Sequence, residues 1–274
     1  MNLGRISRAF EDARKDGRRA LVGYMTAGYP SLKHTGRLCK ALIDGGIDVL
    51  ELGIPFSDPI ADGPTIQGAV VKALDNGTTP SSCLAIACDI KRESQIPIVF
   101  LTYYNPVFRF GLDQFMDEAS KCADGLVVPD LPEIESDEFS DYKSSARAHG
   151  LSAILLAAPT TNDRRLGALL SETSGFLYLV SLLGVTGVRR SVSSTNLRFI
   201  EHVSRKARGL TNVAVGFGIS SPYQVRTMLQ TGADGVIVGS AFVNIVSRNQ
   251  DDIDSAESKL LRFTKGLQNA TRIE

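Results

Sequence analysis

The sequence predicts one α/β domain spanning residues 1–274, a (β/α)8 TIM barrel with an extra N-terminal helix and additional helices. Short apolar strands alternate with amphipathic helical stretches along the whole chain, as in parallel sheets with helices outside. No linker, low-complexity run or charge block divides it, and 274 residues suit one barrel. The alternative, a doubly wound open sheet, would usually have fewer strands.

Eight apolar segments are expected to form the strands: residues 20–25, 47–52, 96–103, 125–128, 152–157, 175–180, 213–217 and 235–238. Amphipathic stretches between them include residues 35–44, 112–121, 135–149 and 197–208. Leu3, Ile6 and Phe10 fall on one helical face, which predicts a folded leading helix. Residues 78–93 and 255–267 are expected to form helices beyond the eight of the barrel.

Polar, Gly and Pro residues gather where the predicted strands end. They are Thr26-Ala27-Gly28, Glu51, Tyr103-Tyr104-Asn105-Pro106, Pro129-Asp130, Pro159-Thr160, Ser181, Gly216-Phe217-Gly218 and Gly239-Ser240. Barrel enzymes build their sites at the carboxyl ends of the strands. The predicted active site therefore lies at that end.

The second strand ends in a carboxylate. Alternation places Ile47, Val49 and Glu51 on one face and Leu50 and Leu52 on the other, so both faces are predicted to be covered. Burial would raise the pKa of Glu51 and suit it to acid–base catalysis. The alternative is that Glu51 is a carboxylate of the barrel core, paired with a partner side chain.

A second carboxylate, Asp62, lies in the Gly- and Pro-rich loop that follows, before a helix expected to begin near Thr65. Two acids in unlike settings indicate two different proton-transfer roles. The alternative is that Asp62 only closes a turn or caps the helix.

Two late strand-to-helix junctions predict an anion site. The strand 213–217 runs into Gly218, with Ser221 and Pro222 placed as N-cap and first helical residue, and the last strand runs into Gly239 and Ser240. Glycine lets backbone N–H groups approach an anion, and a helix N-terminus adds a favourable dipole. The alternative is that these glycines only turn the chain. Residues 184–191 are predicted to form a lid, or else a plain surface loop.

The composition excludes several classes. Lys+Arg and Asp+Glu both number 30, which favours neither nucleic acid nor an anionic membrane as partner. No apolar run reaches the roughly 18 residues of a membrane span, and charges through the first 16 residues exclude a signal peptide, so a cytoplasmic location is expected. The four cysteines show no metal-ligand spacing and are expected to be free thiols.

The chain resembles the tryptophan synthase alpha subunit family over nearly its full length. Residues 51–67 carry the most specific part of the resemblance and read ELGIPFSDPIADGPTIQ. The segments YYNP at 103–106, PDLP at 129–132, GVTG at 184–187 and GFGIS at 216–220 follow in the family's order. The resemblance implies a lyase of L-tryptophan biosynthesis that reversibly cleaves indole-3-glycerol phosphate to indole and glyceraldehyde 3-phosphate.

The resemblance also implies residue roles. Glu51 and Asp62 match the catalytic acids, and Gly187, Gly218, Gly239 and Ser240 match the phosphate site. An indole pocket would be lined by Tyr24, Leu101, Tyr103, Val127, Tyr178 and Phe217, with filling of the barrel core as the alternative for these side chains. Tyr178 is expected to donate a hydrogen bond to Asp62, and Thr186 to touch Asp62 when the lid closes.

The family implies a partner, a beta subunit that holds pyridoxal phosphate, in an α2β2 heterotetramer. The expected contact rim comprises Asp58-Pro59, Asn105-Pro106, Asp130-Leu131-Pro132 and residues 184–190. No cofactor or metal is expected in this chain. Two rivals stay open: another phosphate-binding barrel enzyme, such as a sugar-phosphate isomerase or cyclase, and a catalytically silent barrel that only activates the beta subunit.

Overall fold

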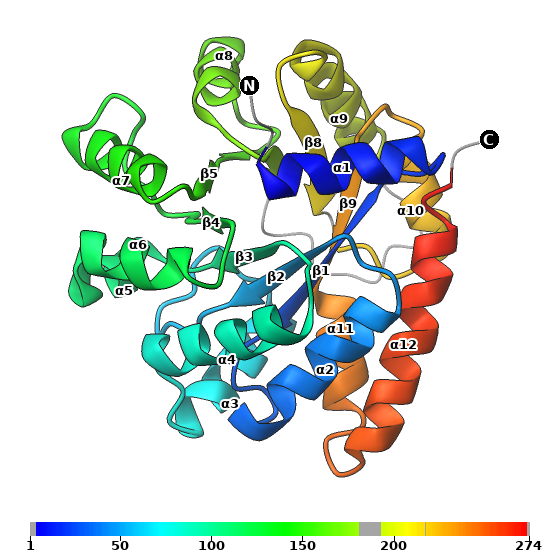
Figure 1. The fold of residues 1–274 in the computed structure, drawn as a ribbon. Coiled ribbons are helices and arrows are strands. Elements are labelled where there is room, and N and C mark those ends of the chain that lie inside the picture. The colour runs from blue at the N-terminus through cyan, green and yellow to red at the C-terminus, as the bar shows by residue number, and fades with distance from the viewer. Residues whose placement is uncertain (1–3, 181–192, 217, 273–274) are drawn as a thin grey trace.

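Nine parallel strands form one sheet that closes into a barrel (Figure 1). The structure is a computed structural model that describes residues 4–180, 193–216 and 218–272. The strands are β1 (Ala20–Thr26), β2 (Val49–Gly53), β3 (Ile98–Leu101), β4 (Gly125–Val127), β5 (Ser152–Ile154), β6 (Leu156–Ala157), β7 (Phe176–Val180), β8 (Asn212–Gly216) and β9 (Gly235–Val238). Their order, β5-β4-β3-β2-β1-β9-β8-β7-β6, begins and ends in one chain segment, so the ring closes there. The predicted (β/α)8 barrel is confirmed.

The fifth barrel strand is interrupted, whereas we predicted one strand over residues 152–157. β5 pairs with β4, β6 pairs with β7, and Leu155 separates the two. The N–H of Leu155 donates to Thr173 Oγ1 at 3.1 Å, while its carbonyl accepts from Tyr178 N at 2.9 Å. The Thr173 side chain therefore accepts the hydrogen bond from Leu155 N–H that a backbone carbonyl of a neighbouring strand would otherwise accept.

Helices surround the barrel (Figure 1). They are α1 (Arg5–Lys15), α2 (Leu32–Asp44), α3 (Pro64–Asp75), α4 (Pro80–Glu93), α5 (Tyr104–Phe110), α6 (Leu112–Ser120), α7 (Asp137–Ala148), α8 (Asp163–Glu172), α9 (Ser194–Ala207), α10 (Pro222–Leu229), α11 (Ser240–Ser247) and α12 (Ile253–Asn269). The leading helix and the two additional helices are confirmed as α1, α4 and α12. None of the helices in the described part of the chain is both long enough and apolar enough to cross a membrane.

The inside of the barrel is a separate apolar core, closed at the amino end of the strands by α1. Ile6 and Phe10 of α1 pack with inward-facing strand residues such as Val22 and Val49. A Cβ on Gly235 would lie 2.8 Å from Phe10 Cε1, so this strand must begin with glycine for the helix to fit. The amino end is thereby filled, and the carboxyl end is left for a site.

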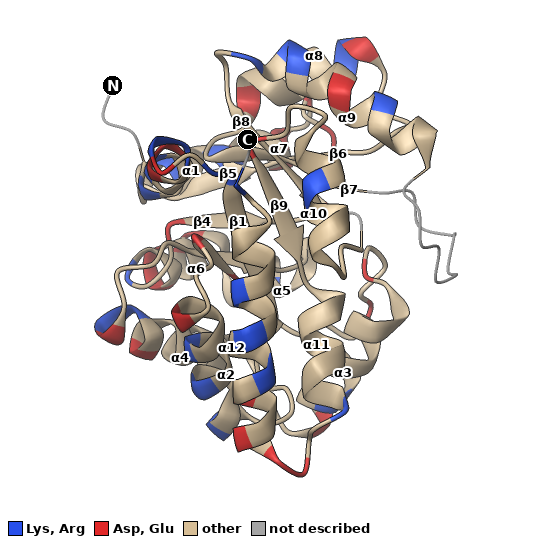
Figure 2. Cartoon of the chain, turned by 90° about the vertical axis from the view of Figure 1, so that its right-hand side faces the viewer, with Lys and Arg blue, Asp and Glu red and all other residues tan. Residues whose placement is uncertain are grey.

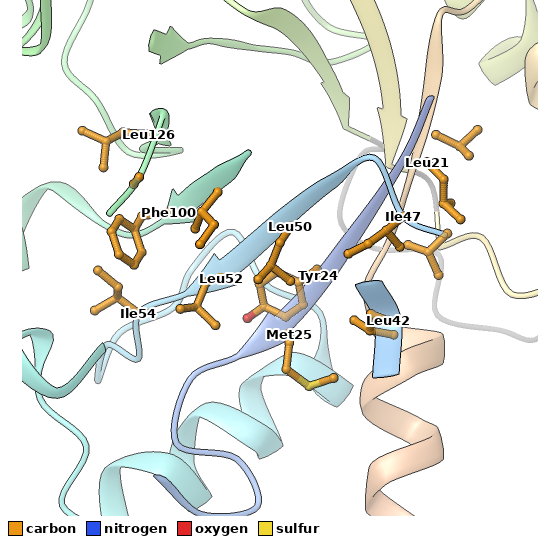
Figure 3. Packing of buried hydrophobic residues seen from close by; sticks show 14 of the residues in the cluster. Leu21, Tyr24, Met25, Leu42, Ile47, Leu50, Leu52, Ile54, Phe100 and Leu126 are labelled. Atoms are coloured by element: carbon orange, nitrogen blue, oxygen red, sulfur yellow. The ribbon is translucent and has the colours of Figure 1, made fainter. Parts of the chain in front are cut away.

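The outer face of the sheet packs against the helices. Figure 3 shows Leu50 and Leu52 in this outer layer, beside Phe100 of β3. The prediction that Ile47 shares a face with Val49 and Glu51 is wrong. Ile47 belongs to the outer cluster, because it precedes β2 and the alternation of that strand does not extend to it. Lys, Arg, Asp and Glu lie mainly on the surrounding helices (Figure 2).

Three aspartates connect adjoining segments at the amino ends of the strands through hydrogen bonds. Asp48, Asp124 and Asp234 each accept a backbone N–H from an adjoining segment, from Leu21, Ile98 and Val213 at 2.8, 2.9 and 3.0 Å respectively. Each is also paired with a cation, namely Arg18, Lys91 and Arg14, respectively. Partly buried acceptors satisfied in this way hold strand register. These acids are therefore structural, in contrast to those at the opposite end.

Candidate active site

A cavity of about 630 Å³ opens at the carboxyl ends of the strands. Residues from every strand position around the barrel line it. They include Tyr24, Glu51, Asp62, Leu101, Pro129, Ala157, Thr160, Thr161, Arg165, Tyr178, Gly216, Gly218, Ile237, Gly239 and Ser240. Its lining combines apolar side chains with polar groups that converge on the same space, among them Glu51, Asp62 and Arg165.

Glu51 lies in this cavity and is almost completely buried, with 1% of its surface exposed. Among the described residues its Oε1 has no hydrogen-bond partner. Burial, and secondarily the nearby charge of Asp62, raises the pKa of Glu51 to about 8. The alternative of an ion-paired core carboxylate does not describe this group, which is instead a largely protonated acid facing an open space.

Asp62 reaches the same cavity from the loop between β2 and α3. Its Oδ2 accepts a hydrogen bond of 3.0 Å from the hydroxyl of Tyr103, which itself accepts one of 3.0 Å from the N–H of Ala61. Burial raises the pKa of Asp62 to about 6, although the Tyr103 hydrogen bond acts to lower it. Asp62 does not cap the helix, because the N-cap position of α3 is Gly63. We expected Tyr178 in the role that Tyr103 fills.

Glycines make room for two tyrosine rings in the cavity. A Cβ on Gly53 would lie 2.3 Å from the hydroxyl oxygen of Tyr24, and one on Gly216 would lie 2.8 Å from Cε1 of Tyr178. The Tyr24 hydroxyl lies 3.0 Å from Thr26 Oγ1, and burial holds the pKa values of both phenols well above 10. Two neutral aromatic rings thus line the same cavity as Glu51.

The two late strand-to-helix junctions differ in what they offer an anion. At α10, Ser221 accepts from the N–H of Gln224, as predicted for its N-cap, and the Gln224 side chain accepts from the N–H of Ser220 at 2.8 Å. At α11 the N-cap is Gly239, and no side chain of the described residues caps this helix. The first N–H groups of α11 therefore remain available beside the cavity. Gly218 has φ +65° and lines the same wall.

The predicted site residues are largely brought together. Tyr24, Leu101, Tyr178, Gly218, Gly239 and Ser240 line the cavity with both acids. Val127 is fully buried in the inner core, and the residue that reaches the cavity from this strand is Pro129, two positions later. Tyr103 is hydrogen-bonded to Asp62 and Ala61 of the loop and is not among the described residues that line the cavity. Thr186, Gly187 and Phe217, and the predicted lid, lie outside the described residues.

The segment after the fifth barrel strand contributes more than the predicted Pro159-Thr160, since Thr161 and Arg165 were not predicted. Thr160, Thr161 and Arg165 line the cavity there, and α8 begins with Asn162 as its N-cap. The signal was present in the Thr-Thr-Asn-Asp-Arg-Arg run, which combines a helix cap with arginines in the first turn. No group of three or more His, Cys, Asp or Glu in the described residues could hold a metal ion.

Comparison with known proteins decides the family. The family model for the tryptophan synthase alpha chain matches residues 10–272. The chain belongs to the tryptophan synthase alpha chain family. It is accordingly an enzyme, a lyase that cleaves indole-3-glycerol phosphate to indole and glyceraldehyde 3-phosphate in tryptophan biosynthesis.

Individual members of the tryptophan synthase alpha chain family match over most of their length. The alpha chain of Methanoregula boonei is 44% identical over 98% of each chain. A structure of Mycobacterium tuberculosis tryptophan synthase has a TM-score of 0.87 at 32% identity, covering 100% of each chain. A structure of the Pyrococcus furiosus tryptophan synthase complex has a TM-score of 0.81 at 37% identity, covering 92% of this chain and 99% of the other.

Proposed function

We propose that Glu51 carries the proton transfers of this cleavage and that Asp62 stabilises the cation that forms along the reaction path. The observation that carries the proposal is one cavity shared by two acids. Glu51 is buried, and its Oε1 has no hydrogen-bond partner among the described residues, while Asp62 is a loop carboxylate bound to Tyr103. Their unlike surroundings leave Glu51 largely protonated and Asp62 largely ionised near neutral pH. That is the division needed when one group gives a proton and the other stabilises a cation.

The chemistry explains why two acids are needed. The C3 carbon of an aromatic indole is a poor leaving group, so it is first protonated, by Glu51, to give an indolenine cation. The Asp62 carboxylate accepts a hydrogen bond from N1–H and stabilises this charge, which develops only along the reaction path. The Glu51 carboxylate then takes the proton of the adjacent glycerol hydroxyl. An aldehyde forms as the C–C bond breaks, its electrons restore the indole ring, and Glu51 regains its proton.

The remaining residues bind the substrate. The N–H groups at Gly239 and Ser240, with Gly218 and, from the resemblance, Gly187, cradle the phosphate. The indole ring lies between Tyr24, Leu101 and Tyr178, with Phe217 and Thr186 contributing as the family pattern implies. The structural support is that the described members of this set line one cavity with the two acids.

A beta subunit that holds pyridoxal phosphate is proposed as the partner, in an α2β2 assembly within the cytoplasm. Two large apolar side chains support a docking rim: Ile60 and Phe108 are 71% and 65% exposed. They adjoin the Asp58-Pro59 and Asn105-Pro106 segments expected at the contact. Ile60 follows β2 and Phe108 lies in α5, after β3, so both belong to segments at the carboxyl ends of the strands, where the cavity opens. We propose no cofactor or metal in this chain, and one domain over residues 1–274.

The direct test is release of indole from indole-3-glycerol phosphate by the purified chain, titrated with beta subunit. We expect measurable cleavage by the chain alone and a saturable increase on adding the partner. Cleavage that is absent in both conditions would support a catalytically silent activator instead. Turnover of a different sugar phosphate without indole release would support the isomerase or cyclase alternative.

The pH dependence of cleavage should report both acids. Asp62 must be ionised and Glu51 protonated at the start, and their pKa values are raised to about 6 and about 8. We therefore expect kcat/KM to rise as pH increases through about 6, to level off, and to fall above about pH 8. Steady-state rates measured from pH 5 to 10 would check this, and a profile flat over that whole range would contradict the assignment.

A further inference from the structure

Arg165 is an unexplained cation at the mouth of the active-site cavity. It is the third residue of α8, it is solvent-exposed, and its side chain lines the cavity. The other Asp, Glu, Lys and Arg residues on the described wall are Glu51 and Asp62 only. Within the described residues the Arg165 guanidinium forms no ion pair.

The surrounding contacts keep Arg165 free to act on a ligand. Its backbone N–H donates to the Asn162 side chain at 2.9 Å, which fixes the first turn of α8 without using the guanidinium. The nearby acid Asp163 is occupied by His202 and Lys206 of α9, at 2.8 and 2.9 Å. The neighbouring Arg164 is also exposed but does not line the cavity.

We propose that Arg165 is a specificity residue that draws the phosphate-bearing end of the ligand into this cavity, an inference that rests on the proposed function. The charges around the cavity favour such a group. A phosphate monoester carries a charge of about −1.5 to −2 at pH 7, and the ionised Asp62 repels it. The donors of the glycine cradle are neutral backbone dipoles. A guanidinium stays charged at all relevant pH values and can donate two parallel hydrogen bonds to a phosphate.

The position at the mouth indicates when Arg165 acts. A cation at the opening of a low-dielectric cleft raises the local concentration of anionic ligands and speeds their entry. Arg165 lies in the segment after the fifth barrel strand, whereas Glu51 lies within β2, so the two side chains reach the cavity from different parts of the barrel. Arg165 therefore favours phosphorylated over unphosphorylated indole derivatives.

The test compares Arg165→Gln with Arg164→Gln as a matched control on the same helical turn. For Arg165→Gln we expect kcat/KM for indole-3-glycerol phosphate to fall about tenfold, through KM, with kcat little changed. Arg164→Gln should match the unmodified chain. Added KCl should lower kcat/KM of the unmodified chain and of Arg164→Gln more steeply than that of Arg165→Gln.

Binding measurements separate this proposal from the proposed function. Inorganic phosphate and glyceraldehyde 3-phosphate should bind Arg165→Gln more weakly by a similar factor, and neutral indole should bind it unchanged, with unfolding temperatures equal. Equal phosphate binding by the two variants would overturn the role of Arg165 even if cleavage occurs. Weaker indole binding to the same degree would reveal a structural effect instead and also overturn it. A lack of cleavage by the unmodified chain would reject the proposed function, and the phosphate-binding comparison would still decide about Arg165.

Discussion

Replacing Glu51 by glutamine is expected to lower indole release by about a thousandfold or more, within the range that a positioned general acid or base contributes. The change keeps the size of the side chain, which has 1% of its surface exposed, but removes the proton that must reach C3. Substrate binding should be nearly unchanged, because the cradle at Gly239 and Ser240 lies elsewhere in the cavity. Single-turnover cleavage together with substrate binding would measure both quantities.

Stability provides the control for this variant. The pKa of Glu51 is raised from 4.5 to about 8 by folding, so its stabilising contribution is full below pH 4.5 and is lost as pH rises toward 8. The Glu51→Gln variant should therefore gain stability relative to the unmodified chain between pH 4.5 and 8. Denaturant unfolding at both pH values would check this. Retained cleavage in a folded variant would remove Glu51 from the mechanism.

Replacing Asp62 by asparagine is expected to lower kcat by about a hundredfold, less than loss of the proton donor. Asparagine can still accept the N1–H hydrogen bond through its carbonyl, but it lacks the negative charge that stabilises the indolenine cation. The rise in kcat/KM near pH 6 should disappear in this variant, because that rise belongs to ionisation of Asp62. The pH profile of the residual activity would measure this.

The Tyr103→Phe variant tests whether the hydrogen bond from Tyr103 sets the pKa of Asp62. The Tyr103 hydrogen bond lowers the pKa of Asp62, so its removal should move the rise in kcat/KM to higher pH and leave the fall near pH 8 in place. A loss of rate at all pH values without a shift would show that Tyr103 only supports the loop. A persistent rise near pH 6 in Asp62→Asn would assign that titration to another group.

Local periodicity explains why much of the barrel was predictable. Val49 and Glu51 point inward and Leu50 outward because successive strand residues alternate, a rule that needs only neighbours along the chain. The cap at Ser221 is equally local, since its side chain bonds the N–H three residues on. The alternation did not hold at Ile47, because β2 begins only at Val49. Strand ends are set by pairing with other strands, which alternation does not report.

The two acids and the glycine junctions were readable from the chain because their residue types sit next to strand ends that a repeating pattern locates. Contacts between segments that are distant in sequence could not be predicted from the chain in this way. Three findings depend on inter-strand register and on how the barrel closes. Tyr103, rather than Tyr178, forms the hydrogen bond to Asp62. Val127 stays in the core while Pro129 reaches the cavity, and Thr173 interrupts the fifth strand. Arg165 joins the cavity for the same reason, since only the closed ring brings the start of α8 toward Glu51 and Asp62. Patterns along a chain report which face a residue takes, whereas its depth and its partners follow from packing between segments far apart in sequence.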